Sequence, residues 1–350
     1  MAKHLITGGN GYLGSHIANK LIDLGHEVII LDVIDDKERN PKTSFRQVDI
    51  LDKISLLECL KDVEVVHHNA ALVPLRKAGK KFWDVNVVGT QNVLECSLEA
   101  NVRHLSHMSS SAVFGNLVKS DCPISKTPSR LKPIEIYGRS KEAGEKIIFE
   151  YLRSPQRMSA SIIRPRTIIG KERLGIFKIL FEWISEGRKI YIIGNGKNIF
   201  QFAHVDDLVN ASIKSSFINF SGELNIGTDR YGSLRDCLEN LISHSKTNSK
   251  VVSLPTNLSI FLLWILDKLK LSPLGPWHYL TYHKDYFFDI EDEKKILSWT
   301  PKESNDEMLI SSYEWYLKNK KFLDTDFDKD KSTHKSSLKQ GILELLKKIS

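Results

Sequence analysis

The sequence is poor in the residues that mark disulfide scaffolds, metal centres and membrane spans. Only four of its 350 residues are cysteine, with no C-x-x-C pair, so we expect structural thiols in a reducing compartment. The histidines include no H-E-x-x-H motif, which leaves a metal site without support. The longest apolar stretch, near residues 260–266, is far shorter than the roughly 20 residues of a membrane span. Because the N-terminus also enters a strand rather than a signal peptide, a cytoplasmic protein without a membrane span is predicted.

The chain also lacks a basic arm. Its formal charge is +7, but charges of both signs are spread along the whole length, with no arginine-rich run among aromatic residues. This pattern speaks against a nucleic-acid partner and leaves a mild preference for anionic ligands. The length and the 41% hydrophobic content are sufficient for one large α/β domain with an appended lobe, or for two modest domains.

Short apolar runs alternate with helical patterns in the first half of the chain. This alternation predicts parallel βαβ crossovers and an α/β fold with a Rossmann-type doubly wound parallel sheet, which binds ligands at the carboxyl ends of its strands. The predicted strands are 4–7, 27–31, 45–48, 63–68, 103–108 and 160–163, and the predicted helices are 12–24, 52–60, 82–100 and 138–152.

The rhythm loosens after residue 165, which suggests a division of the chain. We expect a Rossmann domain over 1–165, joined by returning segments from the C-terminal half, and a smaller C-terminal α/β substrate lobe over 166–318. Segments 191–208 and 224–228 and a helix from Ser233 are assigned to this lobe.

Residues 319–350 are expected to form a polar linker and an amphipathic C-terminal helix. The linker is placed at 323–336, and the helix has one apolar face. We expect this tail to dock on a partner subunit or peripherally on a membrane, while a closing helix of the same domain is the alternative. The apolar face comprises Leu338, Ile342, Leu345, Leu346 and Ile349.

A glycine-rich segment, TGGNGYLG at residues 7–14, lies between the first predicted strand and the first predicted helix. Glycine is needed where such a turn is tight, where the backbone approaches a pyrophosphate, and where helix packs on strand. The helix N-terminus then offers N–H groups to the phosphates. The cofactor-binding residues predicted here are Gly8, Gly11, Tyr12, Leu13 and Gly14.

Asp32 ends the second predicted strand, where a carboxylate can accept hydrogen bonds from both ribose hydroxyls of an adenosine. The same carboxylate repels a 2′-phosphate, and the following VIDD supplies no arginine to receive one. The predicted cofactor is therefore NAD rather than NADP.

The segment YGRSK places Tyr137 and Lys141 four residues apart at the start of a helix, and hence on one face. A tyrosine titrates near ~10 and is a poor base at neutral pH, but a neighbouring ammonium lowers the pKa of its phenol. The pair can then take a proton from a substrate hydroxyl while hydride leaves its carbon for NAD.

These motifs occur in an order that resembles the extended short-chain dehydrogenase/reductase superfamily, with nucleotide-sugar epimerases and dehydratases and the 3β-hydroxysteroid dehydrogenase branch. The resemblance covers roughly residues 3–318 and points to the NAD-dependent epimerase/dehydratase family. The matching segments are TGGNGYLG, Asp32, VDI (48–50), HNAA (68–71), NVVGT (86–90), SSSAVFG (109–115) and YGRSK (137–141).

The resemblance implies roles for further residues and a homodimer formed through helices 82–100 and 138–152. A hydroxyl five residues before Gly115 holds the reacting oxygen, which selects Ser110, and Ser111 points to the other side if the segment continues as a strand. Ser111 is then a substrate-binding candidate. The remaining implied cofactor contacts are Asp49, Ile50, Ala70, Ala71, Lys141 and the backbone after Pro165.

The residues after Ser110 limit the reaction. Similar dehydratases carry Asp-Glu there and sugar-acid decarboxylases carry Glu, whereas this chain has Ser111 and Ala112. The expected reaction is therefore 4-epimerisation of a nucleotide-linked sugar by oxidation and re-reduction. The alternatives are a secondary-alcohol dehydrogenase of the 3β-hydroxysteroid type and a catalytically silent NAD-binding scaffold.

The substrate class is argued from one missing residue. Many nucleotide-sugar relatives carry an arginine four residues before the histidine of an HVDDL-like segment, and here that position is Phe200. Either Arg173 and Lys197 hold the diphosphate instead, or the substrate has none. His67 and His68 are expected to be structural, hydrogen-bonded residues.

Overall fold

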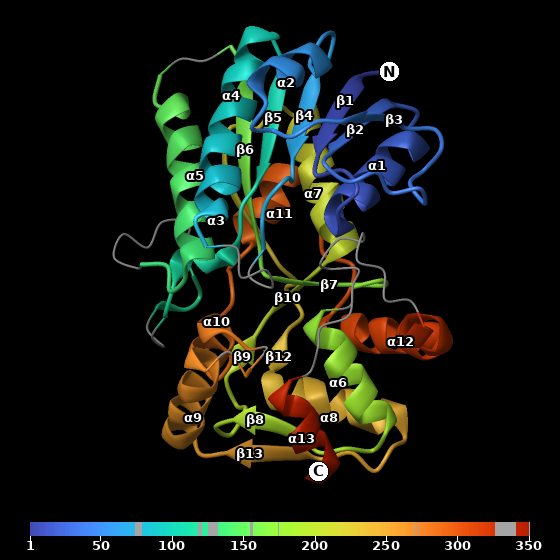
Figure 1. Ribbon diagram of the computed structural model, residues 1–350, viewed down its shortest axis with the longest axis vertical. Helices are drawn as coiled ribbons and strands as arrows, with labels where there is room; N and C mark the ends of the chain where they lie inside the picture. Colours follow the sequence, from blue (N-terminus) through green and yellow to red (C-terminus); the bar gives the residue numbers. More distant parts are fainter. Residues whose placement is uncertain are drawn as a thin grey trace.

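The computed structural model describes residues 1–73, 79–117, 121–124, 132–154, 157–173, 175–269, 271–272, 274–325 and 341–349. A parallel sheet with its helices forms one part of the molecule, and a smaller lobe lies below its carboxyl edge (Figure 1). The N-terminus lies in the sheet part and the C-terminus at the far end of the lobe (Figure 1). The predicted Rossmann-type fold is confirmed.

The main sheet has seven parallel strands in the order β11-β6-β5-β4-β1-β2-β3. Apolar and β-branched residues dominate these strands, and residues 5 to 7 of β1 and all of β4 are buried because helices cover both faces. Its strands are β1 (Lys3–Thr7), β2 (Glu27–Asp32), β3 (Ser44–Gln47), β4 (Val65–His68), β5 (His104–Met108), β6 (Ser159–Pro165) and β11 (Gly222–Ile226).

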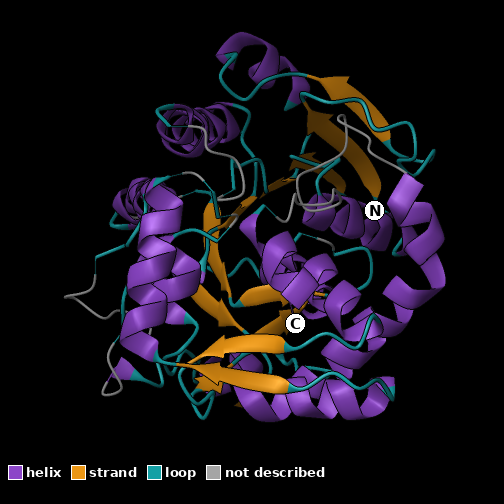
Figure 2. Ribbon diagram, turned by 60° about the horizontal axis from the view of Figure 1, so that its bottom comes forward, coloured by secondary structure: helices purple, strands orange, loops and turns teal. Residues whose placement is uncertain are grey.

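Two helical layers enclose the sheet, as Figure 2 also shows. Helices α1 (Tyr12–Asp23), α7 (Val205–Phe217) and α11 (Glu291–Leu297) share one apolar core with the sheet. Helices α2 (Lys53–Cys59), α4 (Gly89–Glu99) and α5 (Ile136–Leu152) share the other. Between α2 and α4 lie β4, the short α3 (Lys81–Trp83) and a π-helical turn, η1 (Asp84–Val88).

The smaller lobe has an apolar core of its own, built largely from aromatic and branched residues. Phe181 packs there between Tyr313 and Tyr316. Its helices are α6 (Ile176–Ser185), α8 (Leu234–Ser245), α9 (Thr256–Lys268), α10 (Pro276–Thr281), α12 (Asn305–Thr325) and α13 (Ile342–Ile349). Its strand pairs are β8 (Ile190–Ile193) with β13 (Val251–Leu254), β9 (Ile199–Phe200) with β12 (Gly232–Ser233), and β10 (Phe202–His204) with β7 (Thr167–Ile169).

Two expectations about the C-terminal half are wrong. The segment 224–228 does not belong to the lobe alone, because residues 224–226 lie in β11, where Asn225 pairs with Arg164 of β6. The linker does not begin at residue 319 or 323, because α12 continues to Thr325. The lobe stabilises this extension, since Lys178 Nζ donates a hydrogen bond to the Leu323 carbonyl at 3.2 Å.

The C-terminal helix docks on its own lobe, so the alternative of a closing helix describes it better than the expected partner or membrane contact. Lys347 forms ion pairs with Glu182 and Glu186 at the end of α6, and Leu343 packs against the core of the lobe. Residues 326–340, including Leu338, and the side chains of Leu345 and Ile349 lie outside the described residues. Among the described residues, no helix is both long and apolar enough to cross a bilayer.

Candidate active site

A cavity of about 440 Å³ lies where the carboxyl ends of the sheet strands face the smaller lobe. Lys197 does not line it, because this side chain is exposed on the loop between β8 and β9. The cavity is lined by all the other predicted site residues, namely Gly8, Gly11, Tyr12, Leu13, Gly14, Asp32, Asp49, Ile50, Ala70, Ala71, Ser110, Ser111, Tyr137, Lys141, Pro165 and Arg173.

The glycine-rich turn leaves room for a ligand at the end of β1. Gly8 has a φ of +66°, and a Cβ at this position would lie 2.7 Å from the Ala70 nitrogen. A Cβ at Gly14 would lie 2.3 Å from the Gly8 carbonyl oxygen, so only glycine fits both places. Gly11 precedes α1 and supplies no side-chain cap. The first N–H groups of α1 therefore suit the pyrophosphate of NAD.

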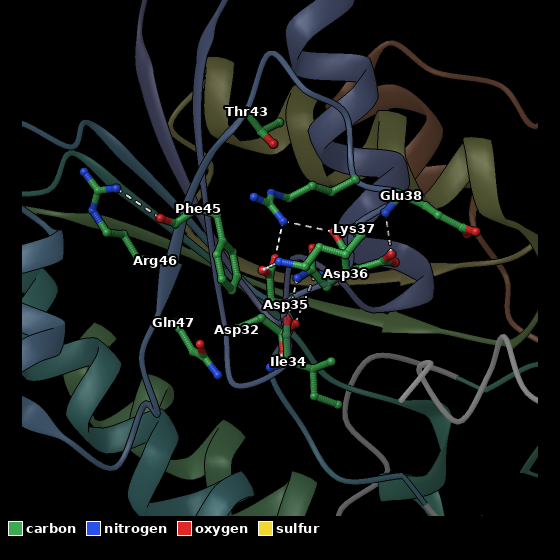
Figure 3. A network of polar contacts seen from close by, with 12 residues as sticks. Asp32, Ile34, Asp35, Asp36, Lys37, Glu38, Thr43, Phe45, Arg46 and Gln47 are labelled. Carbon is green, nitrogen blue, oxygen red and sulfur yellow. Dashed lines mark hydrogen bonds and ion pairs between the residues drawn. The ribbon is translucent and has the colours of Figure 1, made fainter. Parts of the chain in front are cut away.

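Asp32 is held by the backbone at the end of β2. Its carboxylate accepts hydrogen bonds from the Asn10 nitrogen at 3.0 Å and the Ile34 nitrogen at 3.2 Å, and Figure 3 shows Asp32 close to Ile34. Burial raises the pKa of Asp32, while these backbone hydrogen bonds oppose the rise. The carboxylate is thus fixed where it can meet the ribose of an adenosine.

The cations that follow Asp32 are already engaged. Arg39 pairs with Asp35 and stacks over the ring of Phe45 at 4.6 Å, and Lys37 pairs with the same aspartate. Figure 3 shows Asp35, Lys37 and Phe45 in this cluster beside Asp32. Both cations are paired with Asp35, and the Asp32 carboxylate would repel a 2′-phosphate, which fits NAD better than NADP.

Tyr137 and Lys141 project from α5 into the same cavity. Burial raises the pKa of Tyr137, while its hydrogen bond with Ser110 and the positive charge of Arg173 act in the opposite direction. Lys141 donates a hydrogen bond to the Met108 carbonyl at 2.7 Å. Arg173 thus adds a second positive charge to the cavity that Tyr137 and Lys141 line. Burial lowers the pKa of Lys141 to about 8.

The two candidate serines lie at the end of β5, where the chain changes conformation. The strand ends at Met108, and residues from Ser111 to Phe114 form a 3₁₀ turn, η2. The segment does not continue as a strand after Met108, so the expected opposite directions of the two serines do not apply. Both Ser110 and Ser111 line the cavity. Ser110 Oγ accepts a hydrogen bond from the Ala112 nitrogen at 3.2 Å. Ser111 Oγ accepts one from Arg166 at 3.0 Å.

Asn86 connects the cofactor loop to the helix of the catalytic candidates. Its side-chain oxygen accepts a hydrogen bond from the Leu72 nitrogen at 2.8 Å. Its amide nitrogen donates to the Leu72 carbonyl at 3.2 Å and to Ser140 Oγ at 2.9 Å. It lies in the π-helical turn η1, a feature frequent at functional sites. In the sequence, Asn86 stood out only as the first residue of the NVVGT segment.

His67 and His68 are hydrogen-bonded core residues, as expected. His68 bonds Thr7 at 2.7 Å and Thr90 at 3.0 Å, and His67 bonds His4 at 3.2 Å. Burial lowers the pKa of both residues to about 3. They therefore stay neutral under ordinary conditions and hold the strands together.

Sequence reasoning missed several residues of the cavity wall. Arg166 follows β6, and a cation within the apolar segment SIIRPRTII was a usable signal. Glu135 accepts a hydrogen bond from the backbone nitrogen of Trp277 at 2.7 Å. Trp277 and Tyr282 come from α10 and the residue after it, and only the tertiary fold brings them to the cavity.

Residue 200, where many nucleotide-sugar relatives carry an arginine, is buried in the core and does not face the cavity. Phe200 is a core residue, and Gln201 donates a hydrogen bond to the Thr228 carbonyl at 2.7 Å. The cations that line the cavity, among the residues described, are Lys141, Arg166 and Arg173. Among the same residues, no group of histidine, cysteine and acidic side chains could hold a metal ion.

Comparison with known proteins agrees with this geometry. The profile of the NAD dependent epimerase/dehydratase family matches residues 4–217. An uncharacterized protein, y4nG of Sinorhizobium fredii, is 36% identical over 98% of this chain and 85% of its own length. The human sterol-4-alpha-carboxylate 3-dehydrogenase, decarboxylating, is 31% identical over 59% of this chain and 56% of its own length. A putative UDP-glucose 4-epimerase of Methanocaldococcus jannaschii is 33% identical over 69% and 81%.

The solved structures support the same fold. A crystal structure of UDP-glucose 4-epimerase from Thermotoga maritima superposes with a TM-score of 0.72, at 23% identity, over 91% of this chain and 99% of that one. Fold and site together define an NAD-dependent oxidoreductase of the extended short-chain dehydrogenase/reductase type. The chain belongs to the NAD-dependent epimerase/dehydratase family.

Proposed function

We propose that this enzyme epimerises a nucleotide-linked sugar at C4, by oxidising the secondary alcohol and reducing the product from its other face. The observation that carries the proposal is that Ser110 and Tyr137 line the same cavity as the glycine turn and Asp32. NAD, when bound, supplies the hydride acceptor for such a reaction.

The protein's own residues then handle the proton. Tyr137 takes it from the substrate hydroxyl, and Ser110 holds the oxygen through its hydrogen bond. The charge of Arg173 favours the phenolate. Lys141, with a pKa of about 8, carries its charge at neutral pH and can hold a ribose beside the tyrosine.

The cavity wall argues against elimination of water. Ser111 and Ala112 occupy the positions where an acid/base pair is needed, and neither side chain can act as one. Glu135 is the carboxylate nearest in sequence to Tyr137 that lines the cavity, and it is engaged with the Trp277 nitrogen. This arrangement supports oxidation and re-reduction.

Arg173 is proposed to hold the diphosphate of the substrate. Its guanidinium lies over the ring of Tyr12 at 5.6 Å and donates to the Ile168 carbonyl at 3.3 Å. Its Nη1 is buried without a hydrogen-bond partner among the described residues. The similarity to the putative UDP-glucose 4-epimerase supports a nucleotide sugar as substrate.

A homodimer through α4 and α5 is part of the proposal. Trp83, Val88 and Leu98, which lie on or just before α4, are exposed apolar residues, and a second copy would cover such a surface. Sedimentation of the wild type against a Trp83→Lys, Val88→Lys variant tests this contact.

The second candidate is a dehydrogenase that releases NADH, favoured by the similarity to the human sterol dehydrogenase and by Phe200 at the position of the missing arginine. Incubation with UDP-glucose or UDP-galactose separates the two. Epimerisation gives the other sugar without net NADH, and Tyr137→Phe should reduce turnover by ~10²–10⁴-fold with NAD binding retained. Arg173→Ala should raise KM for the UDP-sugar and leave NAD affinity unchanged. NADH accumulation from an apolar secondary alcohol, with no change in either UDP-sugar, would favour the dehydrogenase.

A further inference from the structure

Arg166 is a buried cation on the wall of the cavity that the proposed reaction does not use. It directly follows β6, and only 2% of its surface is exposed. Nη1 donates a hydrogen bond to Ser111 Oγ at 3.0 Å. Nε is buried without a partner, and Nη2 has no hydrogen bond to any described residue. One edge of the guanidinium, Nε with Nη2, is therefore left without an acceptor.

The charge of Arg166 is not compensated by the protein. It forms no ion pair with any residue that the structure describes, and its guanidinium instead lies over Tyr286 at 4.2 Å and Phe200 at 5.0 Å. A cation–π contact offsets only part of the cost of burying an ion. Burial lowers the pKa of Arg166 only to about 10, so the group stays charged at neutral pH.

Arg164, two residues earlier on β6, shows what such an edge binds. Its Nε and Nη2 donate to the two carboxylate oxygens of Glu145 at 2.8 and 2.7 Å. In Arg166 the face of the guanidinium lies over the Tyr286 ring, and Nη1 donates a hydrogen bond to Ser111. The remaining edge has the geometry of a planar, bidentate acceptor, for which a carboxylate is the closest match.

The location of Arg166 selects which part of a substrate it meets. Ser111, its hydrogen-bond partner, directly follows Ser110, and both serines line the cavity together with Tyr137. Arg166 thus belongs to the end of the cavity where the hydroxyl reacts. The diphosphate of a nucleotide sugar is separated from C4 by the sugar ring, whereas a substituent on the neighbouring carbon lies next to the reacting oxygen.

We propose that Arg166, oriented by Ser111, binds a carboxylate that the substrate carries on the carbon next to the one bearing the reacting hydroxyl. The substrate is then a 3-hydroxy acid, and for a nucleotide sugar it is the uronic acid form. The reaction itself rests on the function proposed above, while Arg166 determines the substrate class.

The test compares UDP-glucuronate with UDP-glucose, which differ in the carboxylate, at saturating NAD. The wild type should prefer the acid, and Arg166→Met should lower kcat/KM for the acid by about tenfold to a hundredfold, the usual effect of losing hydrogen bonds to a charged group. The neutral sugar should change by less than about threefold. Ser111→Ala should give a smaller loss for the acid. The control is Arg153→Met, which removes an exposed arginine at the end of α5 and should change neither substrate.

Thermal unfolding without substrate separates recognition from a structural role. Replacing an uncompensated buried charge by an apolar side chain is often neutral or stabilising, so Arg166→Met should unfold at the same or a higher temperature than the wild type. A lower unfolding temperature with equal losses for both sugars would assign Arg166 to the core and overturn the proposal. A wild type that does not prefer the acid would also overturn it, even if it epimerises UDP-glucose normally.

A second pair of probes keeps the proposal testable if neither UDP-sugar reacts, which would refute the nucleotide-sugar function. NADH formation from 3-hydroxybutyrate is then compared with that from 2-butanol. A wild-type preference for the acid that Arg166→Met abolishes supports the carboxylate site. Equal rates for both alcohols in the wild type, or a preference that survives in Arg166→Met, reject it.

Discussion

Acid should unfold this protein through its buried histidines. His67 and His68 on β4 and His104 on β5 have folded-state pKa values of about 3, against an ordinary value of 6.5. Between these values the unfolded chain binds protons that the folded chain excludes, so unfolding is favoured as the pH falls. The stabilisation is fully present above pH 6.5 and is lost progressively below it.

The size of the effect follows from the same numbers. At about pH 5 each of these histidines lowers the free energy of unfolding by (6.5 − 5) × 1.36, or about 2 kcal/mol. His67, His68 and His104 together contribute about 6 kcal/mol, a large part of the 5–15 kcal/mol that typically separates folded from unfolded states. Tryptophan fluorescence during urea unfolding at about pH 7.5, 6 and 5 measures the loss.

One substitution isolates a single histidine. His104 bonds Ser159 at 2.7 Å and Ser161 at 3.1 Å, and His104→Gln should weaken the pH dependence by the share of one proton. His244 is exposed at the end of α8, so His244→Gln is the matched control that replaces a histidine without removing a buried one. An urea midpoint that stays constant between pH 7 and pH 5 would contradict the reasoning.

Three further predictions address the cofactor, the serines and the C-terminal helix. Calorimetry should show NAD binding far more tightly than NADP, and Asp32→Ala should narrow the difference, because the like-charge repulsion is removed; equal affinities in the wild type would count against this role. Ser110→Ala should lower kcat much more than Ser111→Ala for UDP-glucose, since Ser110 is proposed to hold the reacting oxygen while Ser111 bonds Arg166, and the reverse order would exchange their roles. Truncation after Thr325 should leave a folded, NAD-binding protein, because the buried core of the lobe is built from residues before Thr325; loss of the cooperative thermal transition would show that α13 is essential.

Local patterns sufficed for the first half of the fold. The predicted strands at 4–7, 27–31 and 103–108 coincide with β1, β2 and β5 to within a residue, because buried parallel strands form continuous apolar runs. Gly14 could be found because a Cβ there would meet Gly8 and Gly9, which are close in sequence. Gly8 could be found only from the glycine spacing, because its steric requirement comes from Asn69 and Ala70.

Long-range pairing accounts for most of what the sequence did not reveal. The placement of β11 beside β6 joins Asn225 to Arg164, a contact that no local pattern encodes. Trp277 reaches the cavity only because α10 folds back on Glu135. The end of β5 at Met108 depends on the turn around Ser111, which changed the expected directions of the serines. The missing ion pair of Arg166 is likewise a property of the folded surroundings.

The way the chain passes between the sheet and the lobe limits how the cavity can open. The chain leaves the sheet after Pro165, returns at Val205, leaves again after Ile226, and returns once more with α11 before α12. Several connections of this kind resist the rotation that a single hinge would permit. A cut at residue 165 would therefore separate β6 from its partner β11 and leave neither half a complete folding unit.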